Sequence, residues 1–405
     1  MRLSDLVNDR IFLVLKQQFT HSLIHSFYHS IIEHMKYYLI AGERSGDLHG
    51  SNLMKGIRVH DAEAEFRAWG GDLMQAQGAT LVKHYTQMAF MGFWEVVKNL
   101  WTIRDFLKEC KADLLAYQPD ALVLIDYPGF NLRIAEFAKK RGITVFYYIS
   151  PKVWAWNQKR ALKIRANIDR MFVIFPFEVY FYEKYDYKVV YVGNPLMDAI
   201  DAFGPDPDFA QKNQLSGKRI IALLPGSRRQ EVVSTLDTML SIRAEFPDHT
   251  FVIAGVNSLP ADLYQPYQHI PNVSVVFEAT YDLLSIAEAA LVTSGTATLE
   301  TALFGVPEVV CYRTSAVSYG IAKRLIRVPY ISLVNLIMEK EAVRELIQDN
   351  FSAEALATEL RAILPNGSKR ASMEQDYREL KQRVGEAGAS VRAGSAIVNY
   401  LTGNE

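Results

Sequence analysis

Short apolar runs alternate along most of this chain with longer segments in which apolar residues recur at helical spacing. A first series of runs covers residues 37–41, 121–125, 144–149, 171–175 and 189–193, and a second covers 219–224, 250–255, 273–277, 289–293 and 308–312. Such runs, separated by helical segments, are typical of strands in a parallel sheet. The pattern therefore predicts an α/β fold made of strand–helix–strand units.

The spacing of the runs also predicts how the chain divides. Residues 193–218, between the two series, are rich in Pro, Gly and Asp and poor in strand signals, which favours a linker. We therefore expect two Rossmann-like parallel-sheet domains facing a cleft, one over 35–200 and the other over 201–375. From about residue 339 the pattern is helical, as in EKEAVRELIQ, and we expect the helices of 376–405 to pack back on the first domain.

Residues 1–34 are expected to form an extension outside these domains. His21, His25 and His29 recur there at helical spacing, which would bring three imidazoles to one helix face. Either a metal site or an ordinary polar helix face accounts for this spacing.

Composition narrows the function classes. The 405 residues carry a formal net charge of −1, so the chain as a whole has no character of a nucleic-acid-binding protein. Cys110 and Cys311 are the two cysteines, and we expect buried small residues rather than a disulfide pair. No uninterrupted apolar stretch reaches the roughly 18 residues of a membrane-spanning helix. No metal site is expected, because the one D-x-D sequence, Asp206 to Asp208, falls in the proline-rich linker.

Open parallel sheets bind ligands beyond the carboxyl ends of their strands, so the residues after each run are the candidate site residues. After the first run the glycines are Gly42, Gly46 and Gly50, a spacing that is neither G-x-G-x-x-G nor a P-loop, so no nicotinamide cofactor is indicated. Gly42 and Gly46 would let backbone approach a ligand, and Ser45 or Asp47 is expected to cap the next helix. An ordinary capped turn is the alternative.

The sequence LLPGSRRQEV, residues 223–232, indicates an anion-binding turn more clearly than the turn after the first run indicates a ligand site. Gly226 turns the chain, Ser227 is expected to cap, and a helix beginning near Arg228 would direct its positive end at the sheet edge. Backbone amides, helix dipole and guanidinium would then meet at one spot, which suits a phosphate or diphosphate. A plain loop with a surface arginine is the alternative.

The sequence TSGTATLE, residues 293–300, is the third candidate. Ser294, Gly295 and Thr296 are small enough to admit a ligand at a helix start. The Glu300 carboxylate could accept hydrogen bonds from both ribose hydroxyls, although close helix–sheet packing and a dipole-favoured acid would also account for the pattern. Because phosphate and ribose signals occur in one expected domain, we interpret that domain as nucleotide-binding.

Asp126 follows the fully apolar run 121–125, where a carboxylate reaches the edge of the sheet. In that position it could take a proton from an attacking hydroxyl, or it could simply cap a turn. Glu43 and Glu95 are further carboxylate candidates.

Two segments suit an anionic amphiphile. Residues 150–175 hold six Lys and Arg against Asp169 alone, a local balance of +6 − 1 = +5. Anionic lipid or a phosphorylated acceptor could use this charge, and an ordinary solvated basic helix is the alternative. Residues 88–101, MAFMGFWEVVKNLW, are apolar nearly all round, which favours buried core over insertion into a lipid interface.

Ten motifs, in order along the chain, resemble those of the lipid-A-disaccharide synthase family. They are AGERSGDLHG (41–50), MGFWEVV (91–97), IDYPGFN (125–131), YISPKVWAWNQKR (148–160), FPFEVYFY (175–182), VGNPLMD (192–198), LLPGSRRQEV, SGTATLE, VVCYR (309–313) and SLVNLIMEKEAVRELIQ (332–348). The resemblance runs from about Lys36 to the C-terminal helices and leaves residues 1–34 outside it.

The resemblance implies a GT-B glycosyltransferase that joins UDP-2,3-diacylglucosamine to 2,3-diacylglucosamine 1-phosphate, giving UDP and a β-1,6-linked lipid A precursor. The first domain would bind the acceptor and the second the UDP-sugar, with no cofactor. The protein would be cytoplasmic and peripheral to the inner membrane. A UDP-sugar 2-epimerase of the same architecture and a nucleotide-sugar sensor without activity are the alternatives.

The resemblance also implies roles for particular residues. The family's catalytic aspartate falls on Asp126, and the acid of its first glycine turn falls on Glu43. Its UDP-binding motifs cover Gly226, Ser227, Arg228, Ser294, Gly295, Thr296, Glu300 and Arg313. Contacts with the acceptor or donor sugar are expected at Gly42, Ser45, Gly46, Glu95 and Asn335.

The chain departs from the family's usual motifs at two positions. Asn194 stands where the family often has His, and Gly129 stands where it often has a second Asp.

Overall fold

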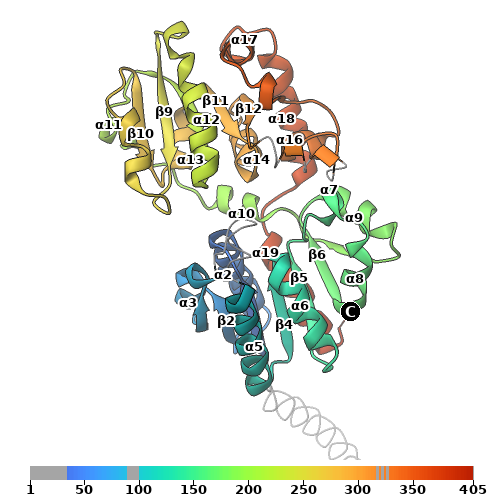
Figure 1. Ribbon diagram of the computed structural model, residues 1–405. Helices are drawn as coiled ribbons and strands as arrows, with labels where there is room; N and C mark the ends of the chain where they lie inside the picture. Colours follow the sequence, from blue (N-terminus) through green and yellow to red (C-terminus); the bar gives the residue numbers. More distant parts are fainter. Residues whose placement is uncertain (1–33, 89–99, 316–318, 321–322, 325–327, 405) are drawn as a thin grey trace, which may run out of the picture. The chain divides into compact units, whose positions relative to one another are not determined.

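The computed structural model describes residues 34–88, 100–315, 319–320, 323–324 and 328–404. The described residues divide into two compact units, one within the limits 1–147 and 393–405 and the other within the limits 148–392. Figure 1 shows β-strands flanked by helices in both units. The domain limits expected from the sequence, at 200 and 375, stay predictions.

The first sheet has seven strands in the described part of the chain, in the order β3-β2-β1-β4-β5-β6-β7. They are β1 (Lys36–Ala41), β2 (Glu65–Gly70), β3 (Thr80–His84), β4 (Ala121–Ile125), β5 (Thr144–Tyr148), β6 (Arg170–Val173) and β7 (Val190–Tyr191). β1 pairs in parallel with both β2 and β4, so the winding reverses between β1 and β4. Ala41 pairs with Ile125 there, and Gly42 and Asp126 therefore leave the sheet side by side.

The second sheet has six strands among the described residues, in the order β10-β9-β8-β11-β12-β13. They are β8 (Arg219–Leu224), β9 (His249–Gly255), β10 (Val273–Phe277), β11 (Ala289–Thr293), β12 (Glu308–Tyr312) and β13 (Arg344–Ile347). β8 pairs in parallel with β9 and β11, and Leu224 pairs with Val292. Pro225 and Thr293 therefore follow at neighbouring positions. In both sheets the candidate residues lie where the strand order reverses, which is where doubly wound sheets bind ligands.

Helices connect the strands on both faces of each sheet. They are α2 (Arg44–Arg58), α3 (Asp72–Ala76), α5 (Leu100–Tyr117), α6 (Pro128–Lys139), α7 (Val153–Trp156), α8 (Arg160–Asn167), α9 (Pro176–Glu183), α10 (Pro195–Asp201), α11 (Phe209–Lys212), α12 (Arg229–Ser241), α13 (Thr280–Ile286), α14 (Thr296–Leu303), α16 (Leu333–Met338), α17 (Ala353–Ile363), α18 (Arg370–Val384) and α19 (Ala389–Thr402). The predicted α/β fold with two Rossmann-like parallel sheets is confirmed.

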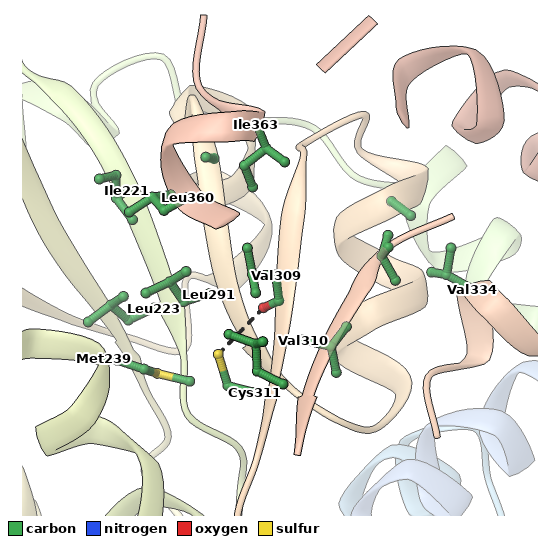
Figure 2. Close-up of a cluster of buried hydrophobic side chains, with 14 of the residues drawn as sticks. Ile221, Leu223, Met239, Leu291, Val309, Val310, Cys311, Val334, Leu360 and Ile363 are labelled. Carbon is green, nitrogen blue, oxygen red and sulfur yellow. Dashed lines mark hydrogen bonds between the residues drawn. The ribbon is translucent and has the colours of Figure 1, made fainter. Parts of the chain in front are cut away.

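Apolar side chains cover both faces of the second sheet. Ile221 and Leu223 belong to the cluster shown in Figure 2, whereas Ile220 and Leu224, on the same strand, belong to the opposite cluster. A strand buried on both faces reads as one continuous apolar run, and that is why the sequence showed these strands clearly. The thiol of Cys311 lies in the cluster of Figure 2, and both cysteines are buried and free, as expected.

One acidic residue lies inside this packed region. Glu308 begins β12, has no exposed surface, and neither of its carboxyl oxygens has a hydrogen-bond partner among the described residues. Burial, followed by the charge of Glu345 on neighbouring β13, raises the pKa of Glu308 well above its usual value. The carboxyl group therefore keeps its proton to a higher pH in the folded chain than in the unfolded chain.

Replacing Glu308 by methionine (E308M) should stabilise the protein, and the gain should grow as the pH rises. The unfolded chain ionises Glu308 near pH ~4.3, whereas the folded chain resists ionisation, so the parent loses stability as the pH rises from that value towards the folded-state pKa. Methionine has similar length and leaves no polar atom unpaired, so the expected gain at pH 8 is on the order of 1 to 3 kcal/mol. Urea unfolding of both proteins at pH 5 and pH 8 measures this, and a difference that is the same at both pH values would contradict it.

Three strands lie where the apolar pattern predicts none. β2, β3 and β13 mix polar with apolar residues, as in EFRAWG, TLVKH and RELI. β3 and β13 are also edge strands, which need not be apolar on both faces. The helix expected from residue 339 is wrong at this point, because α16 ends at Met338 and residues 344–347 form β13.

Helix α19 packs within the first unit, although it comes last in the sequence (Figure 1). A Cβ atom at Gly394 would lie 2.4 Å from the carbonyl carbon of Gly56 on α2, so the two helix backbones approach as closely as glycine permits. Tyr400 meets the ring of Phe146 on β5 edge to face, with ring centroids 5.4 Å apart. The end of the chain thus covers the same sheet that the start of the described chain builds.

Candidate active site

An aromatic ring covers the turn that follows β1. Gly42 is buried, and a Cβ atom there would lie 2.3 Å from Cγ of Tyr127, so only glycine fits under the ring. At Gly46 a Cβ atom would lie 3.1 Å from that of Ala41, so α2 lies close against β1. Both glycines therefore have a packing reason in the protein itself. The approach of a sugar to them stays a prediction.

Glu43 and Ser45 lie on the same turn. Ser45 is exposed in the first turn of α2, whereas Glu43 is half-buried. Burial first, and the charge of Glu43 second, raise the pKa of the Tyr127 phenol. Glu43 and Tyr127 therefore share one environment, between the turn after β1 and the turn after β4.

The helix cap expected at this turn is wrong. α2 begins at Arg44, and no side chain caps it. Asp47 is instead buried and caps α3: its Oδ1 accepts hydrogen bonds from the backbone N–H groups of Gly71 at 2.8 Å and Met74 at 3.1 Å. Its Oδ2 accepts from the N–H of Leu73 at 3.1 Å. Asp47 therefore ties α2 to the start of another helix, a long-range contact that local sequence does not show.

Asp126 follows β4 in a left-handed backbone conformation. Its φ is 43° and that of Tyr127 is 48°, a region that residues with a side chain adopt uncommonly. The carbonyl oxygen of Asp126 accepts hydrogen bonds from Nδ2 of Asn131 at 2.7 Å and from the hydroxyl of Tyr147 at 2.5 Å. Strained residues that are held by their surroundings cluster at functional sites. The backbone thus supports the expectation that Asp126 is a site residue.

Asn131 was not among the residues expected from the sequence. It has no exposed surface, and its Nδ2 also lies within hydrogen-bonding distance of the carbonyl oxygens of Ile40, at 3.4 Å, and Ile125, at 3.3 Å. It therefore holds the carboxyl ends of β1 and β4 to the Asp126 turn. The motif IDYPGFN, which contains Asn131, could have drawn attention to this residue. Its positioning role could not be predicted, because it depends on a contact with Ile40, 91 residues away in the sequence.

The turn after β8 bends at Gly226, whose φ is 99°. α12 begins at Arg229, and its N-cap residue is Arg228, so the expected cap by Ser227 is wrong. Glu231 folds back instead: its Oε2 accepts from the backbone N–H of Arg228 at 3.2 Å, and its Oε1 accepts from Nη1 of Arg228 at 3.4 Å. A Cβ atom at Gly226 would lie 2.3 Å from Oε2 of Glu231, so the turn requires glycine.

An acid of the chain therefore already occupies part of the expected anion site. The Arg228 side chain is 58% exposed, and Glu231 takes one of the five N–H groups of its guanidinium. Ser227 is exposed beside it, and the binding of a diphosphate at this turn stays a prediction.

The turn after β11 leads into α14, with Gly295 as its N-cap in an extended conformation. Thr296 is exposed at the helix start. Ser294 donates from Oγ to the carbonyl oxygen of Ile331 at 2.9 Å, so its hydroxyl binds within the protein. Small residues here allow the segment around Ile331 to lie close to the sheet edge.

Glu300 lies one turn into α14 and is half-buried. Its Oε1 accepts a hydrogen bond from the hydroxyl of Tyr281, on α13, at 2.9 Å. Burial raises the pKa of Glu300, and the bond from Tyr281 opposes this rise. Tyr281 was not among the site residues expected from the sequence. Its position shortly after the run 273–277 was the one feature of the sequence that places it at the carboxyl edge of the sheet.

Arg313 directs its guanidinium at other parts of the same unit. Nη1 donates to Oγ1 of Thr238 on α12 at 2.9 Å, and Nη2 donates to the carbonyl oxygen of Phe351 at 2.5 Å. The guanidinium also lies 4.9 Å from the centroid of the Phe351 ring. The structure therefore gives Arg313 a bracing role between α12 and the turn that precedes α17, and its contact with UDP stays a prediction.

Asn335 is buried and makes all its amide hydrogen bonds within the protein. Nδ2 donates to the carbonyl oxygen of Val343 at 2.8 Å and to Oε1 of Glu345 at 3.0 Å, while Oδ1 accepts from the N–H groups of Ala342 and Val343. Glu345 in turn accepts from the N–H of Ile331, whose carbonyl holds Ser294. Asn335 therefore anchors the segment behind the α14 turn, and the sugar contact implied by the resemblance stays a prediction.

Glu95 and most of the apolar segment 88–101 lie outside the described residues, as do the histidines of the extension. At the ends of that segment, Met88 is buried and Trp101 is 73% exposed, with the guanidinium of Arg104 above its ring. Among the described side chains, no group of three or more His, Cys, Asp and Glu is placed to hold a metal ion.

The comparison with known sequences now decides the family. A family model described as Lipid-A-disaccharide synthetase matches residues 37–398. The chain belongs to the lipid-A-disaccharide synthase family. Lipid-A-disaccharide synthases from Geobacter metallireducens and Syntrophus aciditrophicus are 37% and 38% identical to it, over 90% and 88% of this chain and 96% and 95% of theirs. The function is therefore that of a lipid-A-disaccharide synthase, a glycosyltransferase of lipid A biosynthesis that acts on a sugar donor and a sugar acceptor.

Solved structures share the fold with this family member at low identity. A putative UDP-N-acetylglucosamine 2-epimerase from Listeria monocytogenes aligns with a TM-score of 0.64 at 13% identity, covering 92% of this chain and 98% of its own. The glycotransferase of kitacinnamycin aligns with a TM-score of 0.63 at 14% identity, covering 91% of this chain and 100% of its own. The GT-B-like fold thus occurs in an epimerase and a transferase alike, and the family match is what distinguishes them here.

Proposed function

We propose that the chain transfers the sugar of UDP-2,3-diacylglucosamine to the 6-hydroxyl of 2,3-diacylglucosamine 1-phosphate, with inversion at the anomeric carbon. The products are UDP and a β-1,6-linked disaccharide 1-phosphate. The observation that carries this proposal is the register of β1 and β4, which puts the Asp126 turn beside the Gly42 turn at a switch point of the first sheet. The reaction is inferred from family membership, and this register is the reason for placing the general base, Asp126, at that edge of the sheet.

Each sheet edge would supply one part of the chemistry. Asp126 takes the proton of the acceptor hydroxyl as that oxygen bonds to the anomeric carbon, and Glu43 lies on the adjoining turn. The bond from the anomeric carbon to UDP breaks, and its electron pair stays on the diphosphate. Arg228 and the N–H groups at the start of α12 stabilise that charge, while Glu300 accepts hydrogen bonds from the ribose.

Synthesis from defined acylated substrates tests the reaction. With donor and acceptor together, mass spectrometry should detect the disaccharide 1-phosphate, and NMR should show the β configuration. With donor alone, the sugar should stay unchanged. An isomerised sugar in the absence of acceptor would favour a UDP-sugar 2-epimerase instead, and tight UDP binding without product from any acceptor would favour a sensor.

We also infer that the protein binds the cytoplasmic surface of the inner membrane peripherally. α8 exposes Lys163 and Arg165 beside Leu162, whose side chain is 53% exposed, and Tyr180 on α9 is 68% exposed. Basic side chains next to exposed apolar ones suit an anionic lipid surface. No helix in the described residues has the length and apolar character to cross a bilayer. Sedimentation with vesicles should show salt-sensitive binding to anionic lipid, and equal binding to neutral vesicles would count against the role of charge.

A further inference from the structure

A tyrosine holds the carboxylate that is expected to meet the nucleotide. The hydroxyl of Tyr281, at the start of α13, donates to Oε1 of Glu300 on α14 at 2.9 Å. The two helices follow β10 and β11, which lie on opposite sides of the β9–β8 pair in the second sheet. The hydrogen bond therefore joins two helices that follow different strands of the same sheet, and no motif of the sequence had linked them.

The Tyr281 ring is fixed by two further aromatic rings. It meets Phe203 edge to face, with centroids 5.4 Å apart, and lies tilted against Phe304, with centroids 4.9 Å apart. Phe203 and Phe304 also meet each other at 5.8 Å. A ring packed in this way has little freedom to rotate, so its hydroxyl points steadily at the carboxylate.

The protonation states of Tyr281 and Glu300 favour a hydrogen bond in which the phenol donates and the carboxylate accepts. Burial, followed by the charge of Glu300, raises the pKa of Tyr281, so the phenol keeps its proton. The hydrogen bond in turn opposes the rise that burial causes in the pKa of Glu300. Among the described residues, Oε2 of Glu300 accepts no hydrogen bond. A carboxylate with one oxygen held and the other open can still accept from two neighbouring hydroxyls.

We propose that Tyr281 is a positioning residue for nucleotide recognition: it fixes the Glu300 carboxylate so that this group accepts hydrogen bonds from the vicinal hydroxyls of the UDP ribose. This inference rests on the proposed function, because it assigns Glu300 to the ribose. It adds a residue that neither touches the nucleotide nor takes part in the chemistry. Its effect should appear in donor binding and leave the chemical step unchanged.

The variant Tyr281→Phe tests the role, since it removes the hydroxyl and keeps the packed ring. We expect the Kd for UDP to rise roughly tenfold, which corresponds to one hydrogen bond to a charged group. The ratio of the Kd for 2′-deoxy-UDP to the Kd for UDP should fall, because the Glu300 carboxylate is no longer held in the orientation that accepts hydrogen bonds from the ribose hydroxyls. The KM for the UDP-sugar should rise while kcat stays close to that of the parent. Calorimetry and steady-state kinetics measure these values.

The matched control is Tyr267→Phe. Tyr267 lies in the same unit and donates to Oδ1 of Asp237 at 2.7 Å, so the variant also removes a phenol–carboxylate hydrogen bond. It should leave the affinity for both nucleotides as in the parent. A loss in the control equal to that in Tyr281→Phe would mean a general structural effect and would overturn the proposal.

A Glu300→Gln variant separates this inference from the ribose assignment. If E300Q retains the preference for UDP over 2′-deoxy-UDP, Glu300 does not read the ribose and both ideas fall, whereas disaccharide synthesis by the parent still tests the transferase function. If E300Q removes the preference and Tyr281→Phe retains it, the role of Tyr281 alone is refuted. The ratio of two affinities measured on one preparation does not depend on its folded fraction, so partial unfolding cannot imitate either result.

Discussion

Asp126→Asn is expected to lower kcat/KM by about a thousandfold or more while UDP binds as in the parent, since a general base is commonly worth 10² to 10⁴ in rate. Asparagine cannot take the proton of the acceptor hydroxyl. It also tolerates the left-handed backbone, here at φ 43°, as well as aspartate does. The hydrogen bonds to the Asp126 carbonyl involve the main chain and should persist, so the loss should reflect chemistry and leave folding intact.

Glu43→Gln is the matched control for this variant. Glu43 lies on the adjoining turn and is the other described carboxylate expected to act in catalysis. A smaller loss in Glu43→Gln than in Asp126→Asn would agree with Asp126 as the base. The reverse order, with Asp126→Asn near the parental rate, would assign the base to Glu43. Initial rates with saturating donor and varied acceptor measure both.

Arg228→Ala should lower kcat by about a hundredfold, because removing one preorganised donor to a developing anion commonly costs about 3 kcal/mol. The departing diphosphate gains charge in the transition state, and the Arg228 guanidinium belongs to the turn that follows β8. The KM for the donor should change less than kcat, since the charge on the bridging oxygen develops only as the bond breaks.

Two further variants isolate the contribution of Arg228. Arg229→Ala removes the neighbouring exposed cation, the first residue of α12, and should leave kcat within about threefold of the parent, since the contact with the diphosphate is proposed for Arg228 alone and a charge without such a contact is screened by solvent. Arg228→Ala also removes the guanidinium that pairs with the Glu231 carboxylate, so the double variant R228A/E231Q shows how much of the loss comes from repulsion between that carboxylate and the diphosphate. A parental rate in Arg228→Ala would remove Arg228 from the mechanism.

The sequence was informative where a strand is buried on both faces. β1, β4, β8 and β11 are such strands, and the turns that follow them hold most of the expected site residues. Strands of mixed composition at or near a sheet edge, such as β2 and β13, lack that signal because solvent can reach part of their surface. The periodicity of residues 344–347 therefore suggested a helix, although they add a strand to the second sheet.

Helix caps and positioning contacts were harder to predict for a different reason. Ser45 and Ser227 are residue types that favour caps, yet neither caps its helix, and Asp47 caps a helix that begins 25 positions later in the chain. Asn131 and Tyr281 act through partners far away in sequence. Local pattern shows which turns hold a site, whereas tertiary contacts decide which side chains orient it.

The pairing of Arg228 with Glu231 has a consequence for turnover. A diphosphate that binds Arg228 would exchange one anion for another, so its net gain would be the difference between two ion pairs. When UDP leaves, the guanidinium would regain its internal counter-ion at once and would not face solvent alone. Such an exchange would lower the retention of spent nucleotide and favour the next cycle.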